Sequence, residues 1–541
     1  MHDLAAALQE WQALLGTDRV DSQAAEQYRR GTEGHDRAIA AVLRPADAER
    51  IPDLVRIAAR YRIPLYPIST GHNWGYGTAK PVTSEAVILD LGALNRIVLV
   101  DGERGLVSIE PGVTQAQLSQ YLLERELPYM VPVTGAGPSC SLLANALERG
   151  YGITPHIDHF GAVTSLEAVL ADGSLYRRSL AELGGADVDA SFKWGLGPYL
   201  DGLFSQSGFG IVTRMTLALA PKPDALTMLF FSFGREEDLA RAVELVHTLH
   251  RRFRGVIGAV NLLNRRRMLS MLEPYPRDAV AAGEIIPESR IEAMAERHRV
   301  FPWTGLCAFY GDQAVVAAAT RAAKRLLRPH TVRLLALSPS RIETLQRIAA
   351  WLPGSIGRNL RAQLDTLNAT TDILLGVPRE VALPLAYWRT CPAPASDLNP
   401  ARDGCGLLWF APLVPLRQAA ALDYVALATR IMTEHGIEPL ITLTCFSELC
   451  ADSTVPILFD GASAAEAERA WACYWALYEA CAARGYLPYR LNTEHQRKLA
   501  EKGELWQVAG RLKRALDPHD IIAPGRYSPL RQASVPGPDA P

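Results

Sequence analysis

The chain has 541 residues, of which 48% are hydrophobic and 21% charged, and its formal net charge is −2. This balance is typical of a soluble globular protein, and it gives no basic footprint for nucleic acid, so no nucleic-acid or membrane partner is expected. A chain of 541 residues exceeds what one hydrophobic core usually serves, which predicts two domains.

The cysteines and the N-terminus favour a reducing compartment. The eight cysteines are scattered and form no CxxC pair, so neither a zinc ribbon nor a disulfide scaffold is indicated. No apolar run reaches the about 18 residues of a membrane span, and the first residues lack the basic region of a secretory signal. A cytoplasmic location is therefore expected.

The two histidine pairs, His156-x-x-His159 and His247-x-x-His250, lack a third ligand, so no metal is expected.

The first motif in chain order is a glycine-rich loop between two predicted strands, Ile63–Ile68 and Ala86–Leu91. Glycines at 71, 75 and 77 permit positive φ and a close approach of backbone N–H groups to an anion, so the loop suits a pyrophosphate. A nicotinamide-type Rossmann loop would be followed at once by a helix. A strand follows here, which argues against that fold and leaves an ordinary glycine-rich turn as the alternative.

The elements that follow predict an α+β fold with short strands and crossover helices. Thr114-x-x-Gln117 is a capping-box pattern that opens a helix to about residue 126. A second glycine-rich loop, Gly135–Ser139, precedes a helix at 142–149, whose N-terminus can hold a phosphate. The predicted strands of this half are 38–43, 63–68, 87–91, 96–100, 106–109, 165–170, 174–177 and 211–219.

The predicted pattern of secondary structure changes after Pro221-Lys222-Pro223. Longer helices rich in Ala and Arg, such as 237–249 and 314–327, alternate with strands from there on. A domain boundary is therefore predicted near residue 222. The tail from about residue 529 is rich in Pro, Ser and Gly and is predicted to be disordered.

Four stretches in order resemble the vanillyl-alcohol oxidase / p-cresol methylhydroxylase family of flavoproteins: Gly71–Gly77, Gly135–Phe160, Lys193–Gly210 and Asp517–Gly525. The resemblance implies an α+β, bipartite FAD-binding domain with an α/β cap over the isoalloxazine, and a homodimer. The implied domains are 1–222 and 485–528 for FAD, 223–484 for the cap, and 529–541 for the tail.

The resemblance also implies the residues that contact FAD. They cluster in the two glycine-rich loops, with a few from the strand at 211 and the C-terminal segment. They are Ser69, Thr70, Gly71, His72, Asn73, Trp74, Gly75, Gly77, Pro132, Gly135, Gly137, Ser139, Ser141, Asn145, Gly152, Ile211 and Arg526.

The catalytic residues that the resemblance implies are Tyr76, Tyr489 and Arg490, which match positions that hold a phenolic oxygen, and Asp158, which matches the acidic residue beside flavin N5. A phenol has a pKa of about 10, so its phenolate at neutral pH requires roughly 3 pH units, or about 4 kcal/mol. Charge-assisted hydrogen bonds contribute about 1.5–3 kcal/mol each, so one arginine and two tyrosines are enough.

Purely structural interpretations of these residues stay open. Tyr76 can pack the loop, Tyr489-Arg490 can be a surface pair at a strand end, and Asp158 can cap a helix or form an ion pair.

The flavin tether departs from the family pattern. Leu407 stands where the family's cap carries its tethering His or Tyr, and a leucine cannot form that bond. His72 instead occupies the position of the histidyl link in the related berberine-bridge-type flavoproteins, so a covalent His72–FAD bond is the hypothesis. A histidine hydrogen-bonded to the cofactor is the alternative. Cys140 falls a few residues from where a second, cysteinyl link should stand and is interpreted as a small buried residue.

The expected function is therefore FAD-dependent removal of a hydride from the benzylic carbon of a para-substituted phenol, through a quinone methide. Asp158 would stabilise the reduced flavin or act as the base for water. The electron acceptor is molecular oxygen or a partner protein. The alternative is a covalent-flavin tailoring oxidase for a larger, non-phenolic metabolite, in which Arg490 would hold a carboxylate or carbonyl.

Overall fold

The computed structural model describes residues 3–23, 26–281, 283–351, 354–390, 392–499 and 503–530, without the side chains of 354–359 and 362.

The first half of the chain builds a small, mainly parallel sheet with strand order β1-β2-β4-β3. Strands β2, β4 and β3 are parallel and β1 is antiparallel to β2. The strands are β1 (Val20–Asp21), β2 (Ile39–Leu43), β3 (Leu65–Ile68) and β4 (Ala86–Asp90).

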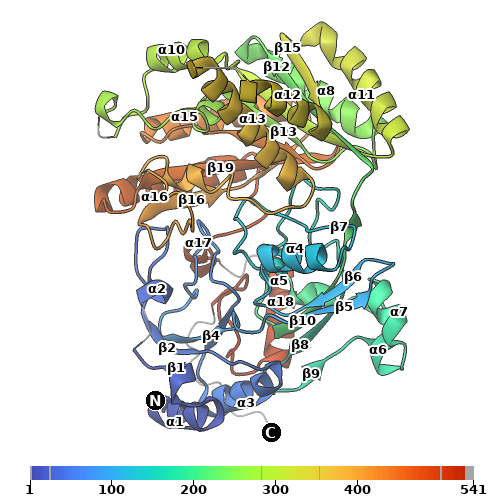
Figure 1. Ribbon diagram of the computed structural model, residues 1–541. Helices are drawn as coiled ribbons and strands as arrows, with labels where there is room; N and C mark the ends of the chain where they lie inside the picture. Colours follow the sequence, from blue (N-terminus) through green and yellow to red (C-terminus); the bar gives the residue numbers. More distant parts are fainter. Residues whose placement is uncertain are drawn as a thin grey trace.

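Helices α1 (Leu4–Leu15) and α3 (Ile51–Tyr61) pack on this sheet (Figure 1). In α3 the apolar residues recur at helical spacing, and Leu54, Val55 and Ala58 are fully buried. The C-terminal segment returns to the same sheet: the N–H of Leu65 donates to the carbonyl of Ile521 at 2.7 Å, and the N–H of Ala523 to the carbonyl of Leu65 at 2.8 Å.

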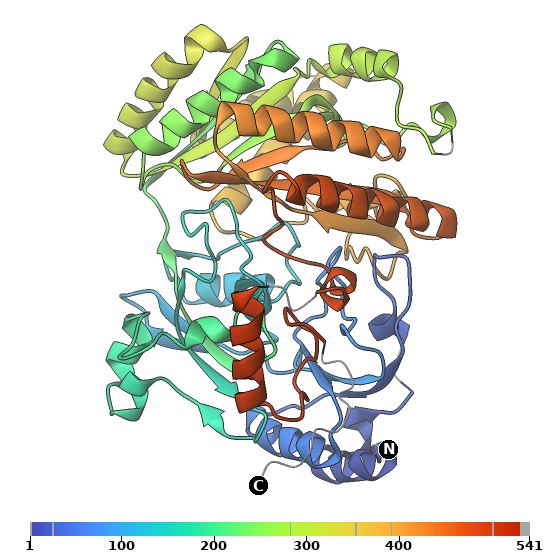
Figure 2. The same cartoon turned by 180° about the vertical axis from the view of Figure 1, so that it is seen from behind.

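A second sheet is antiparallel, with strand order β5-β6-β10-β8-β9. Apolar faces of α4 and α5 cover it, and the capping box at the start of α4, from Thr114 and Gln117, is present. Helix α18 (Glu504–Leu516) lies beside this region (Figure 2), where Lys513 Nζ donates to the carbonyl of Gly208 at 2.6 Å. The elements are β5 (Ile97–Asp101), β6 (Leu106–Ile109), α4 (Gln115–Glu124), α5 (Leu142–Leu147), β8 (Val163–Val169), β9 (Leu175–Tyr176) and β10 (Ile211–Ala218).

Short elements connect the two halves of the chain. The pair β7 (Tyr129–Met130) and β11 (Ala220–Pro221) lies where the chain leaves the second sheet. The other short helices are α2 (Glu26–Arg29), α6 (Ser179–Glu182), α7 (Ala186–Ser191), α9 (Arg265–Leu269), α14 (Pro384–Tyr387) and α17 (Thr493–Arg497). The 3₁₀ turns are Thr17–Arg19, Ala48–Arg50, Asp201–Phe204, Glu236–Asp238, Arg277–Ala279 and Arg328–His330.

The second half of the chain forms a large antiparallel sheet, in the order β15-β12-β14-β13-β18-β19-β16, with β17 paired to β19. Four helices pack against it on the face seen in Figure 2, and α12 and α13 lie on the face seen in Figure 1. The strands are β12 (Ala225–Phe233), β13 (Val260–Asn264), β14 (Trp303–Gly311), β15 (Arg333–Leu337), β16 (Cys405–Phe410), β17 (Leu413–Pro415), β18 (Thr442–Cys445) and β19 (Cys450–Asp460). The helices are α8 (Leu239–Arg252), α11 (Gln313–Leu327), α15 (Gln418–Glu434) and α16 (Ala464–Ala482), then α10 (Glu288–His298), α12 (Pro339–Trp351) and α13 (Gly354–Leu374).

The predicted α+β class is confirmed, and the predicted strands and helices of the first half are present with ends that move by a few residues. The largest differences are at the hairpin, where the predicted strand 174–177 shortens to Leu175–Tyr176, and at helix 142–149, which ends at Leu147. The predicted disordered tail begins at 529, and its residues 531–541 lie outside the described part of the chain.

Candidate active site

The first glycine-rich loop offers a row of free backbone donors. The N–H groups of Gly71, His72, Asn73 and Trp74 donate no hydrogen bond to any residue in the described part of the chain. The indole N–H of Trp74 is also buried without an acceptor. Trp74 is buried and the other three residues are half-buried. Donors left free in such a loop suit an anionic ligand, because an unpaired N–H shielded from water is otherwise costly. The loop therefore fits the pyrophosphate and flavin edge of FAD.

Two glycines of this loop are required by close packing. Gly75 has φ +76°, and a Cβ on it would lie 2.3 Å from Cδ1 of Trp409 on β16. Gly77 has φ +127°, and its Cβ would lie 2.5 Å from Cγ2 of Thr493. The N–H of Trp409 also donates to the carbonyl of Gly75 at 3.2 Å. The loop is thus clamped between the large sheet and the segment that follows α16.

The same segment brings Tyr489 and Arg490 to the loop. The N–H of Tyr489 donates to the carbonyl of Ala411 at 3.3 Å, and the N–H of Thr493 to the carbonyl of Tyr76 at 3.1 Å. The Arg490 guanidinium lies 4.3 Å from the centre of the Tyr76 ring. The predicted trio of Tyr76, Tyr489 and Arg490 is therefore brought together, from positions more than 400 residues apart in the chain.

The position of Arg490 rules out the interpretation of a surface pair. Its side chain is only 13% exposed. Its Nε donates to Glu148 Oε2 at 3.1 Å, and its Nη2 donates to Asn73 Oδ1. Nη1 donates no hydrogen bond to any residue that the structure describes, so one edge of the guanidinium is free to bind a substrate oxygen.

Burial raises the pKa of both tyrosines above their ordinary value. For Tyr76, desolvation is the main cause, partly offset by the positive charge of Arg490. For Tyr489, desolvation dominates and the neighbouring Tyr76 adds to the rise in pKa. Both hydroxyls therefore keep their protons across the physiological range and can act as hydrogen-bond donors. Arg490 is the group that supplies positive charge.

A fully buried carboxyl, Asp452 on β19, lies beside this trio. The Tyr151 hydroxyl donates to Asp452 Oδ2, and the Thr454 hydroxyl donates to the same oxygen at 3.0 Å. Oδ1 has no hydrogen-bond partner among the described residues. Desolvation raises the pKa of Asp452 to about 8, so the group is protonated at neutral pH. It therefore adds no negative charge beside Arg490 under those conditions.

Asp158 occupies a different place. Its side chain is exposed and its Oδ1 accepts the N–H of Gly161 at 2.9 Å, which closes a turn. No hydrogen bond or ion pair links it to Tyr76 or Arg490 in the described chain. The turn is neither the helix cap nor the ion pair of the structural interpretation, and the role of Asp158 beside the flavin stays a prediction.

His72 and the second loop lie together. His72 Nδ1 and Ser139 Oγ are 3.1 Å apart, and the imidazole stacks on Trp74 with ring centres 4.7 Å apart. Burial lowers the pKa of His72, so the ring is neutral at neutral pH. Nε2 has no partner in the described chain, and a neutral imidazole nitrogen of this kind can act as a nucleophile.

Other predicted cofactor residues are also engaged by neighbours. Asn145 Nδ2 contacts His159 Nδ1, and burial lowers the pKa of His159 to about 3, so this imidazole is neutral. The Ser141 side chain caps α5 by accepting the N–H of Ala144 at 3.1 Å. Burial raises the pKa of the Cys140 thiol to about 11, which keeps it protonated and unreactive at neutral pH.

Sequence reasoning missed Glu148, Tyr151 and Asp452. Glu148 and Tyr151 flank Gly150 inside a stretch already singled out for its glycines. Asp452 lies in a strand that is buried over most of its length, and a carboxyl in a buried strand is a usable signal of function.

Comparison with known proteins gives a family match and two relatives that cover nearly the whole chain. A family described as "FAD binding domain" matches residues 39–179. The chain is 35% identical over 537 residues to 1'-carboxy-chondrochloren decarboxylase of Chondromyces crocatus, covering 97% of each chain. It is 29% identical to the 4-cresol dehydrogenase (hydroxylating) flavoprotein subunit of Pseudomonas putida, covering 96% of this chain and 94% of the relative.

Two solved structures share the fold. The crystal structure of p-cresol methylhydroxylase with substrate bound matches with a TM-score of 0.85 and 28% identity, over 97% of each chain. The 4-ethylphenol oxidase from Gulosibacter chungangensis also gives a TM-score of 0.85 over 97% of each chain, at 24% identity, and supports the fold.

The fold and the loop donors define an FAD-dependent enzyme of the oxidoreductase kind. The chain belongs to the vanillyl-alcohol oxidase / p-cresol methylhydroxylase family. No helix in the described ranges is both long enough and apolar enough to cross a membrane.

Proposed function

We propose that the protein removes a hydride from the benzylic carbon of a para-substituted phenol. The observation that carries this proposal is the buried trio in which Arg490, with a free guanidinium edge, lies 4.3 Å from the Tyr76 ring and next to Tyr489. A cation and two hydroxyl donors that stay protonated at neutral pH are suited to bind a phenolate oxygen. Bound FAD supplies the hydride acceptor.

The energetics of phenolate formation are met by these three groups. A phenol with a pKa of about 10 needs roughly 4 kcal/mol of differential stabilisation to ionise at pH 7. One contact to Arg490 and two to tyrosine hydroxyls would supply about 1.5–3 kcal/mol each. Protonated Asp452 leaves this stabilisation undiminished. The phenolate then donates electron density toward the benzylic carbon, and loss of hydride leaves a neutral quinone methide.

FAD would be held by the donors of the first glycine-rich loop and by the second loop. We further propose that Nε2 of His72 would be the attachment point for the 8-methyl group of FAD. The new N–C bond would replace one methyl C–H bond, with the proton lost to solvent and the two electrons taken up by the flavin and passed on to its electron acceptor. This proposal is supported by the neutral, partnerless Nε2 and by Ser139, which fixes the ring through Nδ1. Acid precipitation tests it, because a tethered flavin stays with the protein pellet whereas free flavin is released.

The test of the phenol proposal is anaerobic mixing of the yellow protein with 4-hydroxybenzyl alcohol and with a 4-alkylphenol, while the visible flavin band is followed. Rapid bleaching is expected with wild type and with Arg214→Ala, a half-exposed arginine on β10 that serves as control. Arg490→Ala is expected to keep its flavin and to bleach at least about 100-fold more slowly. Equal bleaching rates in the two variants would refute the role of Arg490.

A second candidate outcome follows from the similarity to a decarboxylase, at 35% identity over nearly the whole chain. If the substrate carries a carboxylate on the carbon next to the benzylic one, the quinone methide can lose CO₂. The electron pair of the breaking C–CO₂ bond then forms the new C=C bond, and the ring returns to a phenolate. Hydride loss and CO₂ loss together convert a phenolic propanoate into a vinylphenol.

The two outcomes are separated by their products. Turnover of 3-(4-hydroxyphenyl)propanoate is followed in H₂¹⁸O, with oxygen and cytochrome c supplied in turn as acceptors. CO₂ with an ¹⁸O-free vinylphenol indicates oxidative decarboxylation. An ¹⁸O-labelled benzylic alcohol that keeps its carboxylate indicates hydroxylation. Flavin bleaching by simple 4-alkylphenols but not by this acid would exclude the decarboxylase alternative.

A further inference from the structure

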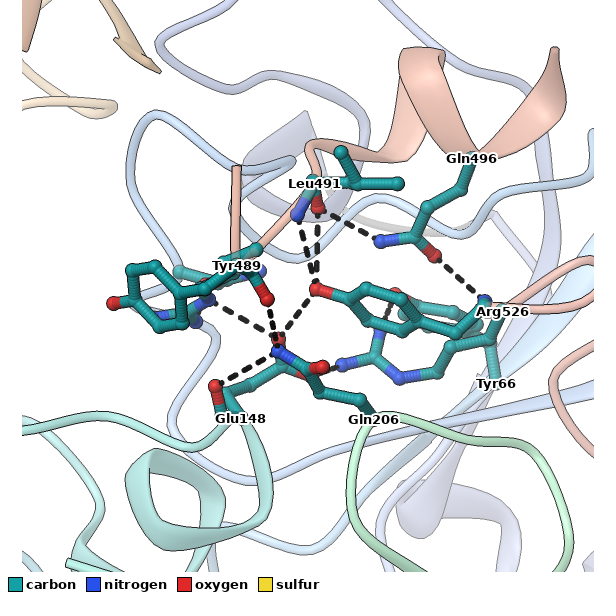
Figure 3. A network of polar contacts seen from close by, with 10 residues as sticks. Tyr66, Glu148, Gln206, Tyr489, Leu491, Gln496 and Arg526 are labelled. Atoms are coloured by element: carbon teal, nitrogen blue, oxygen red, sulfur yellow. Dashed lines mark hydrogen bonds and ion pairs between the residues drawn. The ribbon is translucent and has the colours of Figure 1, made fainter. Parts of the chain in front are cut away.

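Glu148 binds two arginines at once. It follows α5 as its C-terminal cap, and its side chain is 8% exposed. Oε2 accepts from Arg490 Nε at 3.1 Å and from the Tyr527 hydroxyl at 3.3 Å, while Oε1 accepts from Arg526 Nη2. Figure 3 shows Glu148, Arg526 and Tyr66 in one network of polar contacts. One carboxylate thus joins α5, the segment after α16 and the C-terminal segment.

The other contacts in the network fix these three segments. Gln206 Nε2 donates to the carbonyls of Tyr489, at 3.0 Å, and of Glu148, at 3.3 Å. Arg526 Nη1 donates to the Tyr66 hydroxyl, and the N–H of Leu491 donates to the Tyr527 hydroxyl at 3.2 Å. The side chain of Glu148 is therefore held in a single place between the two guanidinium groups.

The charges in this cluster give it an electrostatic effect in addition to its structural one. Two guanidinium groups and one carboxylate leave a net charge of +1 in a nearly buried cluster. In the proposed reaction, one negative charge leaves the phenolate oxygen near Arg490 and arrives on the cofactor, which Arg526 is expected to contact. Each carboxylate oxygen of Glu148 binds one of these arginines, so Glu148 faces both the start and the end of that charge movement.

We propose that Glu148 is a positioning residue that holds the guanidinium groups of Arg490 and Arg526 in fixed positions. Its negative charge partly neutralises both arginines and so limits how strongly they stabilise the substrate phenolate and the reduced cofactor. This proposal rests on the proposed function. It predicts that removal of the Glu148 charge, with its shape kept, favours negative charge at both places. Removal of the whole side chain would also free Arg490 and weaken ligand binding.

The experiment compares Glu148→Gln and Glu148→Ala with wild type as flavin-loaded proteins. Glu110→Gln is the matched control, because the Glu110 side chain is equally buried, at 8% exposure, and pairs with Arg96 at 2.9 Å on the surface of the second sheet. Two quantities are measured. The first is the pH at which bound 4-nitrophenol, a phenol with no benzylic carbon to oxidise, is half ionised. The second is the two-electron midpoint potential of the flavin.

In Glu148→Gln the ionisation midpoint of bound 4-nitrophenol is expected to fall by on the order of one pH unit, since one nearby negative charge is removed. The flavin equilibrium is expected to shift about tenfold toward reduction, which is about 30 mV for a two-electron couple. Glu148→Ala should show the same two shifts and, in addition, about tenfold weaker binding. The control should show none of these changes.

If the ionisation midpoint of bound 4-nitrophenol and the flavin potential both stay at wild-type values in Glu148→Gln, the proposal is overturned and Glu148 is a purely structural link. The same result follows if Glu110→Gln shifts both quantities equally. If Glu148→Ala fails to fold, the isosteric Gln variant still decides. If wild type does not bind 4-nitrophenol, the proposed function fails, and the potential alone decides: an unchanged value overturns the role of Glu148.

Discussion

Asp452→Asn is expected to stabilise the protein, and more so as the pH rises. Asp452 is fully buried with a pKa of about 8, against about 4 for an aspartate in the unfolded chain. The folded state therefore binds more protons than the unfolded state between these values, and stability falls as pH rises through that window. At pH 7 the cost in folding free energy is about 3 pH units, or about 4 kcal/mol, and at pH 5 it is about 1–2 kcal/mol.

An asparagine keeps the shape of the side chain and can still accept the Tyr151 hydroxyl, but it carries no proton to lose. For a chain of this length, about 1 °C of melting temperature corresponds to 1 kcal/mol. The gain in melting temperature of Asp452→Asn over wild type is therefore expected to be about 3 °C larger at pH 7 than at pH 5. The exposed Asp312→Asn serves as control.

The same substitution has a catalytic readout. Ionised Asp452 raises the pKa of Tyr76 and Tyr489 further, which shows that its charge acts on the trio. We expect the rate of flavin reduction by a 4-alkylphenol to fall above about pH 8 in wild type and to stay level in Asp452→Asn. A melting-temperature difference that is constant from pH 5 to 7, together with parallel rate profiles, would refute the assignment of a neutral Asp452.

The other predictions concern the trio and the tether. Tyr76→Phe and Tyr489→Phe should each slow flavin reduction by about 10- to 100-fold, since each removes one hydrogen bond to a charged oxygen worth about 1.5–3 kcal/mol; stopped-flow traces that match wild type would contradict this. Arg490→Lys should recover little of the activity lost in Arg490→Ala, because a lysine cannot keep the Glu148 and Asn73 contacts and still present a free edge. His72→Ala should release its flavin on acid precipitation, whereas Ser139→Ala should keep the bond but form it more slowly; flavin retained in the His72→Ala pellet would exclude the tether.

The local sequence determined much of the frame of this protein. Helix α4 begins at the capping box that Thr114 and Gln117 predict, and α3 forms where apolar residues recur at helical spacing. The glycines at 71, 75 and 77 have positive φ, as their spacing in a strand-to-strand loop suggested. These features depend on residues within a few positions of one another, and so composition and periodicity were enough to predict them.

The resemblance of four stretches then indicated Tyr76, Tyr489 and Arg490 as one group, and the structure brings them together. It could not supply the acidic partners. The acidic residue that the resemblance indicates, Asp158, is exposed in a turn, and its role beside the flavin stays a prediction. The carboxyl groups that face the trio are Glu148 and Asp452.

The contacts of Glu148 and Asp452 and the pKa of Asp452 depend on long-range packing, so the tertiary structure was needed to identify these two residues. Glu148 meets Arg490 across 342 residues of chain, and Tyr151 meets Asp452 across 301. The pKa of Asp452 depends on the desolvation that the surrounding sheet and loops impose, and no local pattern encodes that burial. The sequence thus indicated which side chains would form the proposed phenol site, whereas their charge states and mutual contacts depend on how distant segments pack.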